Sequence, residues 1–389
     1  MSLNLDKSAW RRVVFGDVVR NVNETVKDAE SAGIDRVIAM EHLDPGELKV
    51  ERWGSVADGT TFTRKVKPGQ TLFGKRRAYQ RKVAYAEFEA ICSGDIYTFE
   101  ADDAHLLGEL LPFLVQSNRF FDHALDTSAG SLSPRTNWRD LANFEFDLPP
   151  LDEQKRIADL LWAIEHHQRS LDDMKAKLTV STQQLLSSQL TEGESDIADY
   201  ADILIGFAFR SSEFSLDATE SSRRLVRGIN IGVGLSRWAT NDTVHWNKPL
   251  TEKTVRYLLA AGDIVIPMDR PFTADGQLRW AEVSADEAGA LLVQRVARLR
   301  PKAPELSPLL RSIIRGSSFQ ASLSNSLTGS FAPHLAHGDF TRYNFEAKQP
   351  AKTAEHMVIA ELAERQRRSE GEAVSELLSS TMYEIFGGN

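Results

Sequence analysis

Two long stretches of the chain carry the apolar spacing of extended helices. The first runs from 151 to 190 without proline or glycine, and its apolar residues recur at every seventh position. A seven-residue repeat sustained over this length is typical of a coiled-coil seam, because it keeps one narrow face turned toward a partner helix. We therefore predict a seam made of Ile157, Leu160, Ile164, Leu171, Met174, Leu178 and Leu185.

The second stretch, 353–386, is less regular. Its apolar face includes Leu362, Leu378 and Ile385, but the polar residues 365–368 and Gly371 interrupt it. A helix of about forty residues is about 60 Å long, whereas helices in globular domains average about a dozen residues. We predict that the two helices pack against each other as a rod. Ordinary core helices are the alternative.

The segments that precede the two helices repeat each other. Residues 110–146 align with 309–345 without a gap, and Phe120, Pro134 and Asp140 are identical in the second copy. Further upstream, 35–43 aligns with 223–231, 68–77 with 261–270 and 83–87 with 278–282. The offsets drift, as loop insertions between retained elements produce. Each copy holds short strand-like apolar runs followed by a helical stretch, so we predict two α+β domains.

The composition is that of an ordinary globular protein with several domains. The chain has 389 residues, which is more than one core needs. Cys92 is its only cysteine, so disulfide scaffolds and thiolate metal clusters are excluded. No apolar run reaches the length of about 18 residues that a membrane span requires, and charges near the N-terminus do not fit a secretory signal. We therefore expect no membrane association and a cytoplasmic location.

The net charge of −9 is unfavourable for a nucleic-acid-binding protein, but one segment departs from it. Phosphate neutralisation by Lys and Arg is the main source of DNA affinity that does not depend on sequence. Residues 63–86 contain eight Lys and Arg residues and no acidic residue, and the Pro68-Gly69 pair marks a turn. This predicts an exposed basic loop or hairpin. A solvated charged face that offsets acidic neighbours is the alternative.

The order of domain, long helix, domain and long helix resembles the specificity (S) subunits of Type I restriction-modification enzymes. The residues that carry the resemblance are LPPLDEQKRIADLL (148–161), with Phe15-Gly16-Asp17-Val18 and Gly262-Asp263-Ile264 in support. The helix at the end of the chain departs from the pattern, because QPAKTAEH (349–356) lacks the Pro-Pro-Leu-Asp-Glu-Gln opening.

The resemblance implies the architecture. It implies an α+β fold in which two pseudo-repeated target-recognition domains are separated by two long antiparallel coiled-coil helices. The segments would be recognition domain 1 (1–148), the central helix (149–192), recognition domain 2 (193–349) and the C-terminal helix (350–389). Each domain would read one half of a bipartite DNA site. A helix about 60 Å long suits half-sites one to two DNA turns apart, at about 34 Å per turn.

The resemblance also implies partners and cofactors. The partners are double-stranded DNA, two DNA methyltransferase (modification) subunits that dock on the helices, and motor-nuclease restriction subunits of the full complex. The chain itself would be non-catalytic and would hold no cofactor or metal. S-adenosylmethionine and ATP with Mg²⁺ would bind to the partner subunits.

Candidate DNA-binding residues lie in matching loops of the two copies. Arg forks suit guanine edges and phosphates, whereas Lys suits phosphates. In the first domain we select Lys75, Arg76, Arg77, Tyr79, Arg81, Lys82, Ser133, Arg135 and Asn137. In the second domain we select Arg270, Thr273, Gln277, Arg279, Ser330 and His334.

Two other classes of protein are weighed against this interpretation. A DNA-processing enzyme needs a cofactor loop or an acidic metal cluster, and the sequence has neither a GxxxxGK[ST] phosphate loop nor an Asn-Pro-Pro-Tyr or Asp-Pro-Pro-Tyr box. Such an enzyme would need an active site of unrecognised type. A coiled-coil scaffold that does not read DNA would leave the basic segment and the duplication without a purpose.

Overall fold

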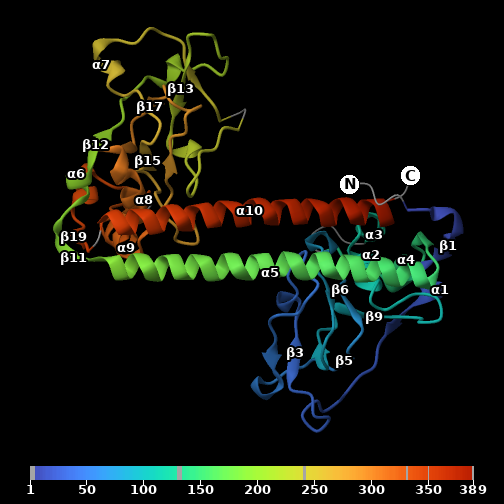
Figure 1. The fold of residues 1–389 in the computed structure, drawn as a ribbon. Coiled ribbons are helices and arrows are strands. Elements are labelled where there is room, and N and C mark those ends of the chain that lie inside the picture. Colours follow the sequence, from blue (N-terminus) through green and yellow to red (C-terminus); the bar gives the residue numbers. More distant parts are fainter. Residues whose placement is uncertain (1–4, 129–133, 240–241, 330–331, 349, 388–389) are drawn as a thin grey trace. The chain divides into compact units, whose positions relative to one another are not determined.

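The computed structural model describes residues 5–128, 134–239, 242–329, 332–348 and 350–387. The chain forms two compact units: unit 1 comprises 1–172 with 369–389, and unit 2 comprises 173–368 (Figure 1). Each unit therefore contains a part of both long helices, α5 (Leu151–Gln189) and α10 (Pro350–Phe386). The predicted four-segment division, whose boundary at 192/193 falls within the strand Leu190–Ser195, stays a prediction.

Unit 1 is built from short strands and helices around an aromatic core. Its elements are β1 (Arg11–Val14), α1 (Phe15–Val18), β2 (Val19–Val22), β3 (Arg36–Ile38), β4 (Gly54–Ser55), β5 (Arg64–Val66), β6 (Thr71–Gly74), β7 (Val83–Tyr85), β8 (Ala90–Cys92), β9 (Ile96–Ala101), α2 (Leu111–Gln116), α3 (Asn118–Asp126), α4 (Trp138–Leu141) and β10 (Glu145–Leu148). One sheet has the strand order β2-β9-β6-β7 and a second β4-β3-β8-β5. Phe15, Phe73, Phe99 and Phe120 are fully buried at the centre of the core.

Unit 2 repeats this topology with aliphatic residues in most core positions. Its elements are β11 (Leu190–Ser195), α6 (Ile197–Tyr200), β12 (Ala201–Ile205), β13 (Arg223–Val226), β14 (His245–Trp246), α7 (Glu252–Val255), β15 (Ile264–Pro267), β16 (Ala281–Glu282), β17 (Leu291–Leu292), β18 (Val296–Pro301), α8 (Ser307–Arg315), α9 (Ser317–Asn325) and β19 (Phe345–Ala347). The order β12-β18-β15-β16 matches that of the first sheet of unit 1. The parallel pair β13–β17 matches the parallel pair β3–β8.

The pairing of strands confirms the predicted repeat and corrects one part of it. In unit 1 Thr71 lies opposite Tyr85, and in unit 2 the equivalent Ile264 lies opposite Glu282. The sequence alignment placed Tyr85 on Trp280, two residues away. The letters match better at the incorrect offset, where Ala86 and Glu87 fall on identical residues, whereas backbone hydrogen bonds allow only one register.

The first turn of α5 is tied to unit 1 by a buried glutamine. Gln154 is 1% exposed. Its Oε1 accepts from the Leu107 amide at 2.9 Å, and its Nε2 donates to the carbonyls of His105 and Pro149, each at 2.8 Å. The glutamine of the LPPLDEQ segment thus fixes the helix start to the globular part. At the same place in α10 stands Thr353, which is fully buried and whose Oγ1 has no hydrogen-bond partner.

Within unit 1 the two long helices run in opposite directions, as the resemblance implied. Ile385 and Phe386 at the end of α10 belong to the same core cluster as Ile157 and Leu161 near the start of α5. Further along, Gly371 of α10 lies beside Gln168 of α5.

The buried positions of α5 follow the predicted seam at one end of the helix and depart from it at the other. Ile157, Ile164 and Leu171 are buried, as is Ile385 of α10. Leu178, Leu185 and Leu378 are half-buried. A helix with 3.6 residues per turn drifts by about 20° per heptad, or nearly one residue over four heptads. Accordingly the buried positions shift to Thr182 and Leu186.

Three seam residues were predicted wrongly. Leu160, Met174 and Leu362 are 38%, 38% and 58% exposed, so they do not lie in a buried seam of this chain. Leu161, next to Leu160, occupies the buried position instead. In α10 the buried positions near Leu362 are Met357 and Ala360.

The junction between helix and globular part differs chemically in the two units. In unit 1 Trp162 of α5 contacts the rings of Tyr85 and Phe113, with centroids 5.4 and 5.0 Å apart. In unit 2 Glu361 of α10 occupies the equivalent position, 199 residues later in the repeat. It forms an ion pair with Arg311 at 2.9 Å.

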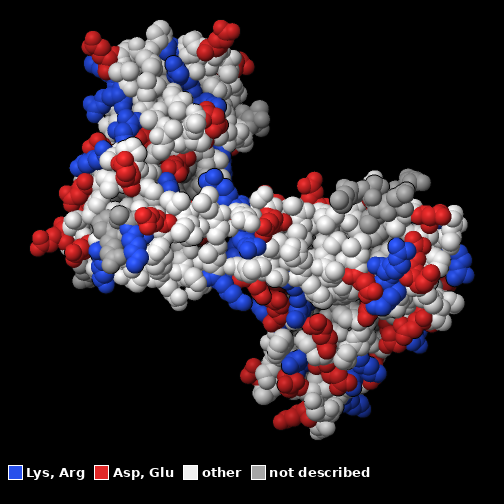
Figure 2. All heavy atoms as spheres, viewed as in Figure 1, with Lys and Arg blue, Asp and Glu red and all other residues white. Residues whose placement is uncertain are grey.

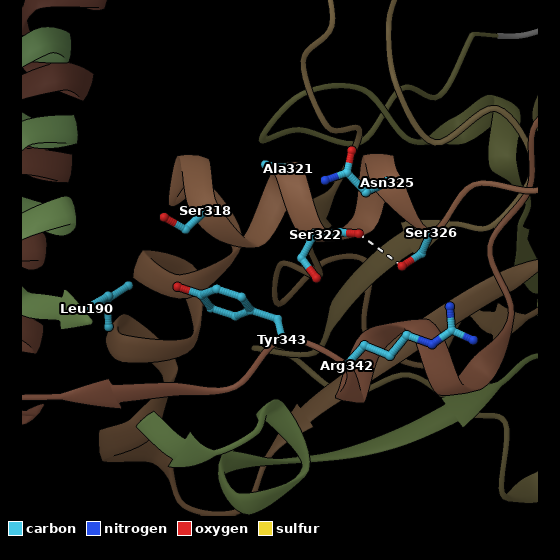
Figure 3. Close-up of a pocket in the computed structure, with 8 residues that line it drawn as sticks. All are labelled: Leu190, Ser318, Ala321, Ser322, Asn325, Ser326, Arg342 and Tyr343. Atoms are coloured by element: carbon cyan, nitrogen blue, oxygen red, sulfur yellow. Dashed lines mark hydrogen bonds between the residues drawn. The ribbon is translucent and has the colours of Figure 1, made fainter. Parts of the chain in front are cut away.

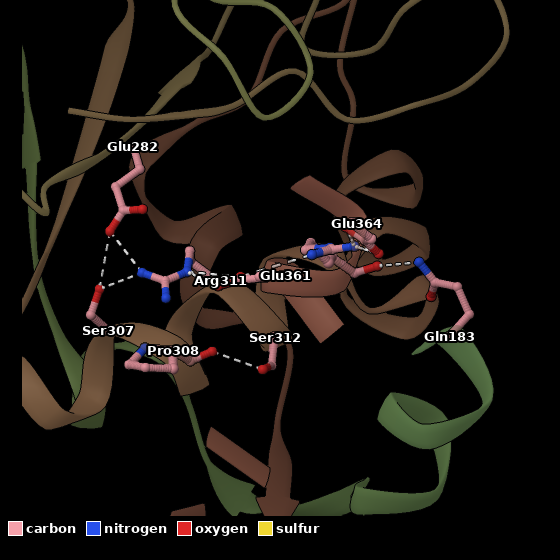
Figure 4. A network of polar contacts seen from close by, with 9 residues as sticks. Gln183, Glu282, Ser307, Pro308, Arg311, Ser312, Glu361 and Glu364 are labelled. Carbon is pink, nitrogen blue, oxygen red and sulfur yellow. Dashed lines mark hydrogen bonds and ion pairs between the residues drawn. The ribbon is translucent and has the colours of Figure 1, made fainter. Parts of the chain in front are cut away.

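That ion pair belongs to a larger network (Figure 4). Arg311 also contacts Glu282 at 2.7 Å, and Arg315 contacts Glu364 at 2.7 Å. Gln183 of α5 donates to the carbonyl of Arg315 at 3.1 Å. An aromatic contact in unit 1 is thus replaced by a charged one in unit 2.

We predict that Gln154→Leu lowers the free energy of unfolding by about 3 kcal/mol, because it leaves buried backbone donors and acceptors without partners at little change of volume. Thr353→Val is the matched control. It removes a buried hydroxyl that has no partner and should leave the stability unchanged or slightly raised. Urea unfolding followed by circular dichroism measures both. Equal midpoints for the wild type and Gln154→Leu would contradict the role of this side chain.

Candidate nucleic-acid interface

The basic segment forms a hairpin, and a distant segment is hydrogen-bonded to its loop. Residues 75–82, the basic loop, connect β6 to β7, whose last pair is Phe73 with Val83. The Arg77 amide donates to the Pro134 carbonyl at 2.8 Å, and the Thr136 amide donates to the Lys75 carbonyl at 2.9 Å. The two candidate loops of the first domain are therefore brought together, although about sixty residues separate them in the sequence.

The basic loop divides its side chains between solvent and the protein interior. Arg77 is exposed, and Tyr79 is 54% exposed. Arg81 turns inward, because it donates to the Gln116 carbonyl at 2.8 Å and lies 4.5 Å from the ring centre of Phe121. Burial lowers the pKa of this guanidinium below its ordinary value.

Two lysines of the basic loop are also engaged. Lys82 Nζ donates to the Met40 carbonyl at 2.6 Å. Lys75 is half-buried with Nζ 5.2 Å from the ring centre of Tyr97, and burial lowers the pKa of its ammonium group. These contacts assign Arg81 and Lys82 to shaping the loop. Whether any selected residue binds DNA stays a prediction.

Asp95 joins the two candidate loops through their side chains. It lies 3.8 Å from Arg76 and 3.3 Å from Arg135. Asn137 is exposed beside them. Ser133 lies outside the described residues.

Unit 2 contains the same backbone arrangement in the loop 268–280. The Arg270 amide donates to the Pro333 carbonyl at 2.8 Å, and the Leu335 amide donates to the Met268 carbonyl at 2.8 Å. Arg270 thus occupies the place of Arg77, as the repeat predicted. Both residues are exposed.

Arg77 and Arg270 share a left-handed backbone. Their φ angles are 54° and 47°. All four described non-glycine residues with positive φ are arginines, the others being Arg81 and Arg295. This conformation costs a side-chain-bearing residue about 1–2 kcal/mol. Such strain tends to persist at functional positions, where the surrounding structure imposes it.

The remaining residues selected in unit 2 fall into two groups. Thr273 and Gln277 form a tight turn, in which the Thr273 amide donates to the Gln277 carbonyl at 2.9 Å. His334 is in contact with Thr328 and Ala332. Arg279 is instead half-buried and donates to the carbonyls of Ile231 and Gly228, so it supports the loop from inside. Ser330 lies outside the described residues.

One charged residue at this edge was missed by sequence reasoning. The Lys75 amide donates to the carbonyl of Asp95, and the Met268 amide donates to that of Arg295, so Arg295 is the counterpart of Asp95. Arg295 pairs with Asp269 at 3.5 Å, where unit 1 pairs Asp95 with Arg76. The charges of the pair are exchanged between the units. Extending the repeat alignment to 95 and 295 could have revealed it.

Charge is mixed over the visible surface of both units (Figure 2). Unit 2 also has a hollow of about 500 Å³ beside α9, lined by Ser318, Ser322 and Arg342 among others (Figure 3). The repeat places Arg119 and His123 of unit 1 at the two serine positions. The hollow therefore arises where short side chains replace long ones. Arg342 in it is already paired with Asp339 at 2.9 Å.

Membrane-spanning helices and metal-binding clusters are both absent from the part of the chain that the structure describes. No helix there combines the length and the apolar character needed to cross a bilayer. No group of three or more His, Cys, Asp or Glu side chains is arranged there to hold a metal ion.

Comparisons with known proteins agree with this architecture. Residues 55–178 match the family described as Type I restriction modification DNA specificity domain. The chain is 32% identical over 133 residues to the specificity subunit of the Type I restriction enzyme EcoAI from Escherichia coli, covering 34% of this chain and 21% of that protein. It is 27% identical over 160 residues to the EcoDI specificity subunit of the same organism, covering 38% and 35%. The matches thus span between a fifth and about a third of these relatives, and the predicted resemblance is confirmed.

Two solved structures share the fold over nearly the whole chain. The Type I restriction-modification S subunit from M. genitalium superposes with a TM-score of 0.61 at 13% identity and covers 100% of both chains. A chain from a study of type I R-M complex assembly superposes with a TM-score of 0.54 at 15% identity and covers 98% of both chains. The predicted α+β fold with two long helices is confirmed.

We predict that Arg77→Gly leaves the free energy of unfolding unchanged or raises it by up to about 1 kcal/mol, because glycine adopts a positive φ without steric cost. Arg139→Gly, at an exposed arginine of helix α4, should lower it by about 1 kcal/mol. Chemical denaturation compares the two variants. Destabilisation of Arg77→Gly by more than Arg139→Gly would show that the Arg77 side chain has a structural role.

Proposed function

We propose that this chain, which carries a Type I restriction modification DNA specificity domain, is the DNA sequence-specificity subunit of a Type I restriction-modification complex. Each unit would read one half of a bipartite site. The observation that carries the proposal is the repeated loop: both units hold an exposed left-handed arginine, Arg77 or Arg270, by the same pair of backbone hydrogen bonds.

The two arginines are suited to direct contact with DNA. A guanidinium fork can donate two hydrogen bonds to the major-groove edge of guanine or to a phosphate. Among the described residues, no acidic side chain forms a salt bridge with Arg77 or Arg270, so their charges are available. We assign Tyr79, Arg135, Asn137, Thr273, Gln277 and His334 to the same reading edges. Lys75, Arg81, Lys82 and Arg279 would hold the loops in shape.

The exchanged ion pairs support different readings by the two units. Unit 1 presents Arg76 held by Asp95, whereas unit 2 presents Asp269 held by Arg295. An arginine fork favours guanine, whereas an aspartate can accept from the amino group of cytosine. Two loops with the same backbone hydrogen bonds at their start and different side chains would therefore read different half-sites.

We propose that the long helices serve as spacer and docking surface. Helix α5 contributes residues to both units without a break, as a spacer between 1–148 and 193–349 requires. Leu160, Met174 and Leu362 are exposed on the helices, which supports docking of two methyltransferase subunits there. Motor-nuclease restriction subunits would join them in the complex, in the cytoplasm.

The chemistry is assigned to those partners. The chain would be non-catalytic. S-adenosylmethionine would bind to the methyltransferase subunits, and ATP with Mg²⁺ would bind to the motor-nuclease subunits.

We predict that Arg77→Gly and Arg270→Gly each relax the recognised sequence in one half of the site and in different halves. A good bidentate contact contributes about 1–3 kcal/mol of discrimination against the wrong base. Methylome sequencing of cells that express each variant with its methyltransferase subunits measures the outcome, and each variant is the control for the other.

Two results would count against the proposal. If the wild-type complex methylates no split sequence, the function itself is wrong. If both variants change the same half, or neither changes any position, the repeated loop is not the reading element.

A further inference from the structure

Two arginines lie near each other on the exposed side of the middle of α10. Arg365 and Arg368 are exposed, and within the described residues neither forms a salt bridge. Both line a cavity of about 470 Å³ in unit 2. Spacing and docking, the proposed roles of the long helices, do not require these two charges.

Comparison of the two units explains why these charges are free. In unit 1 Glu165 of α5 pairs with Arg169 one turn later. The repeat places Glu364 and Arg368 at the same positions of α10. Glu364 instead pairs with Arg315 of α8 at 2.7 Å (Figure 4). The counterpart of Arg169 is thereby left without its carboxylate.

The other acidic groups of the cavity are also occupied. Glu282 and Glu361 pair with Arg311 at 2.7 and 2.9 Å. Two of the four arginines that line the cavity therefore hold its three glutamates, and Arg365 and Arg368 contribute the uncompensated charge.

The cavity is also more polar than its counterpart in unit 1. There, Leu378 and Met382 of α10 line a hollow beside Gly46, which has a φ of 86°. In unit 2 the equivalent residues are Thr179 and Gln183 of α5. Hydrogen-bonding side chains of α5 thus line the cavity in unit 2, where apolar side chains of α10 line the hollow in unit 1.

The cavity adjoins the loop assigned to DNA. Gln277 and Leu278 of the loop 268–280 line it together with Arg365 and Arg368. A DNA strand in contact with Gln277 would carry its phosphates within reach of this cavity.

We propose that Arg365 and Arg368 bind backbone phosphates of the DNA read by unit 2, so that α10 is part of the DNA interface and not only a spacer. The proposal rests on the proposed function. Guanidinium groups bind phosphate oxygens in bidentate fashion. Contacts of this kind position the protein on the duplex without reading sequence.

The test compares DNA binding by the full-length chain in its purified complex with that of two double variants. Arg365→Ala with Arg368→Ala should weaken binding to specific and non-specific duplexes alike. It should also reduce the slope of log K against log salt by about 1 to 2, since each lost phosphate contact removes about 0.9. Lys175→Ala with Lys177→Ala is the matched control. It removes the same charge from exposed sites of α5 outside the cavity and should leave the slope unchanged.

Further variants and ligands separate the outcomes. Arg365→Lys with Arg368→Lys keeps the charge and should retain most of the slope, which excludes misfolding as the cause. An unchanged slope in the alanine variant, or an equal fall of the slope in the lysine control, overturns this proposal. If the wild type still binds specific DNA in that case, the proposed function is unaffected. If the wild type binds no DNA, the proposed function fails first. If inorganic phosphate raises the melting temperature of the wild type only and the alanine variant keeps its slope, the cavity holds a free anion and the proposal is wrong.

Discussion

Two backbone hydrogen bonds in each unit constrain the candidate DNA-binding edge. They join the hairpin loop to a segment about sixty residues away, through Lys75 and Arg77 in one copy and Met268 and Arg270 in the other. In each copy the carbonyl of one residue and the amide of the residue two positions later are both hydrogen-bonded to that segment. The residue between them therefore has little freedom of backbone conformation. That residue is Arg76 in unit 1 and Asp269 in unit 2, each a member of the ion pair. The left-handed Arg77 or Arg270 comes directly after it and is fixed through its own amide.

The duplication conserves backbone geometry more strictly than side-chain chemistry. The same hydrogen bond that places Asp95 beside Arg76 places Arg295 beside Asp269. At the helix junction, Trp162 with its aromatic neighbours corresponds to Glu361 with Arg311. Backbone bonds do not depend on residue type, so each side-chain pair could change as a unit. This freedom lets one fold present two different surfaces.

The same substitutions link the junction of unit 2 to the cavity beside it. Because Arg315 engages Glu364, the neighbouring Arg368 is left uncompensated. In unit 1 the corresponding glutamate is buried, and burial raises the pKa of the Glu165 carboxyl while Arg169 opposes that rise. One glutamate position thus serves the internal stability of α5 in one copy and the attachment of α10 to its globular part in the other.

The sequence by itself determined the features that depend on local spacing. The long helices, the two α+β copies and the basic hairpin all follow from periodicity and from matches along the chain. Gln154 stood within a motif, although its three buried hydrogen bonds were not predictable from its letter.

Only the tertiary structure decided which side chains of those elements face solvent. Arg77 and Arg81 lie four residues apart in one basic run, yet Arg81 is drawn inward by Gln116 and Phe121. The seam likewise passes from Leu185 to Leu186 because a helical turn is not a whole number of residues. Side-chain direction depends on partners that are distant in the sequence and on small accumulated rotations, and a local pattern contains neither.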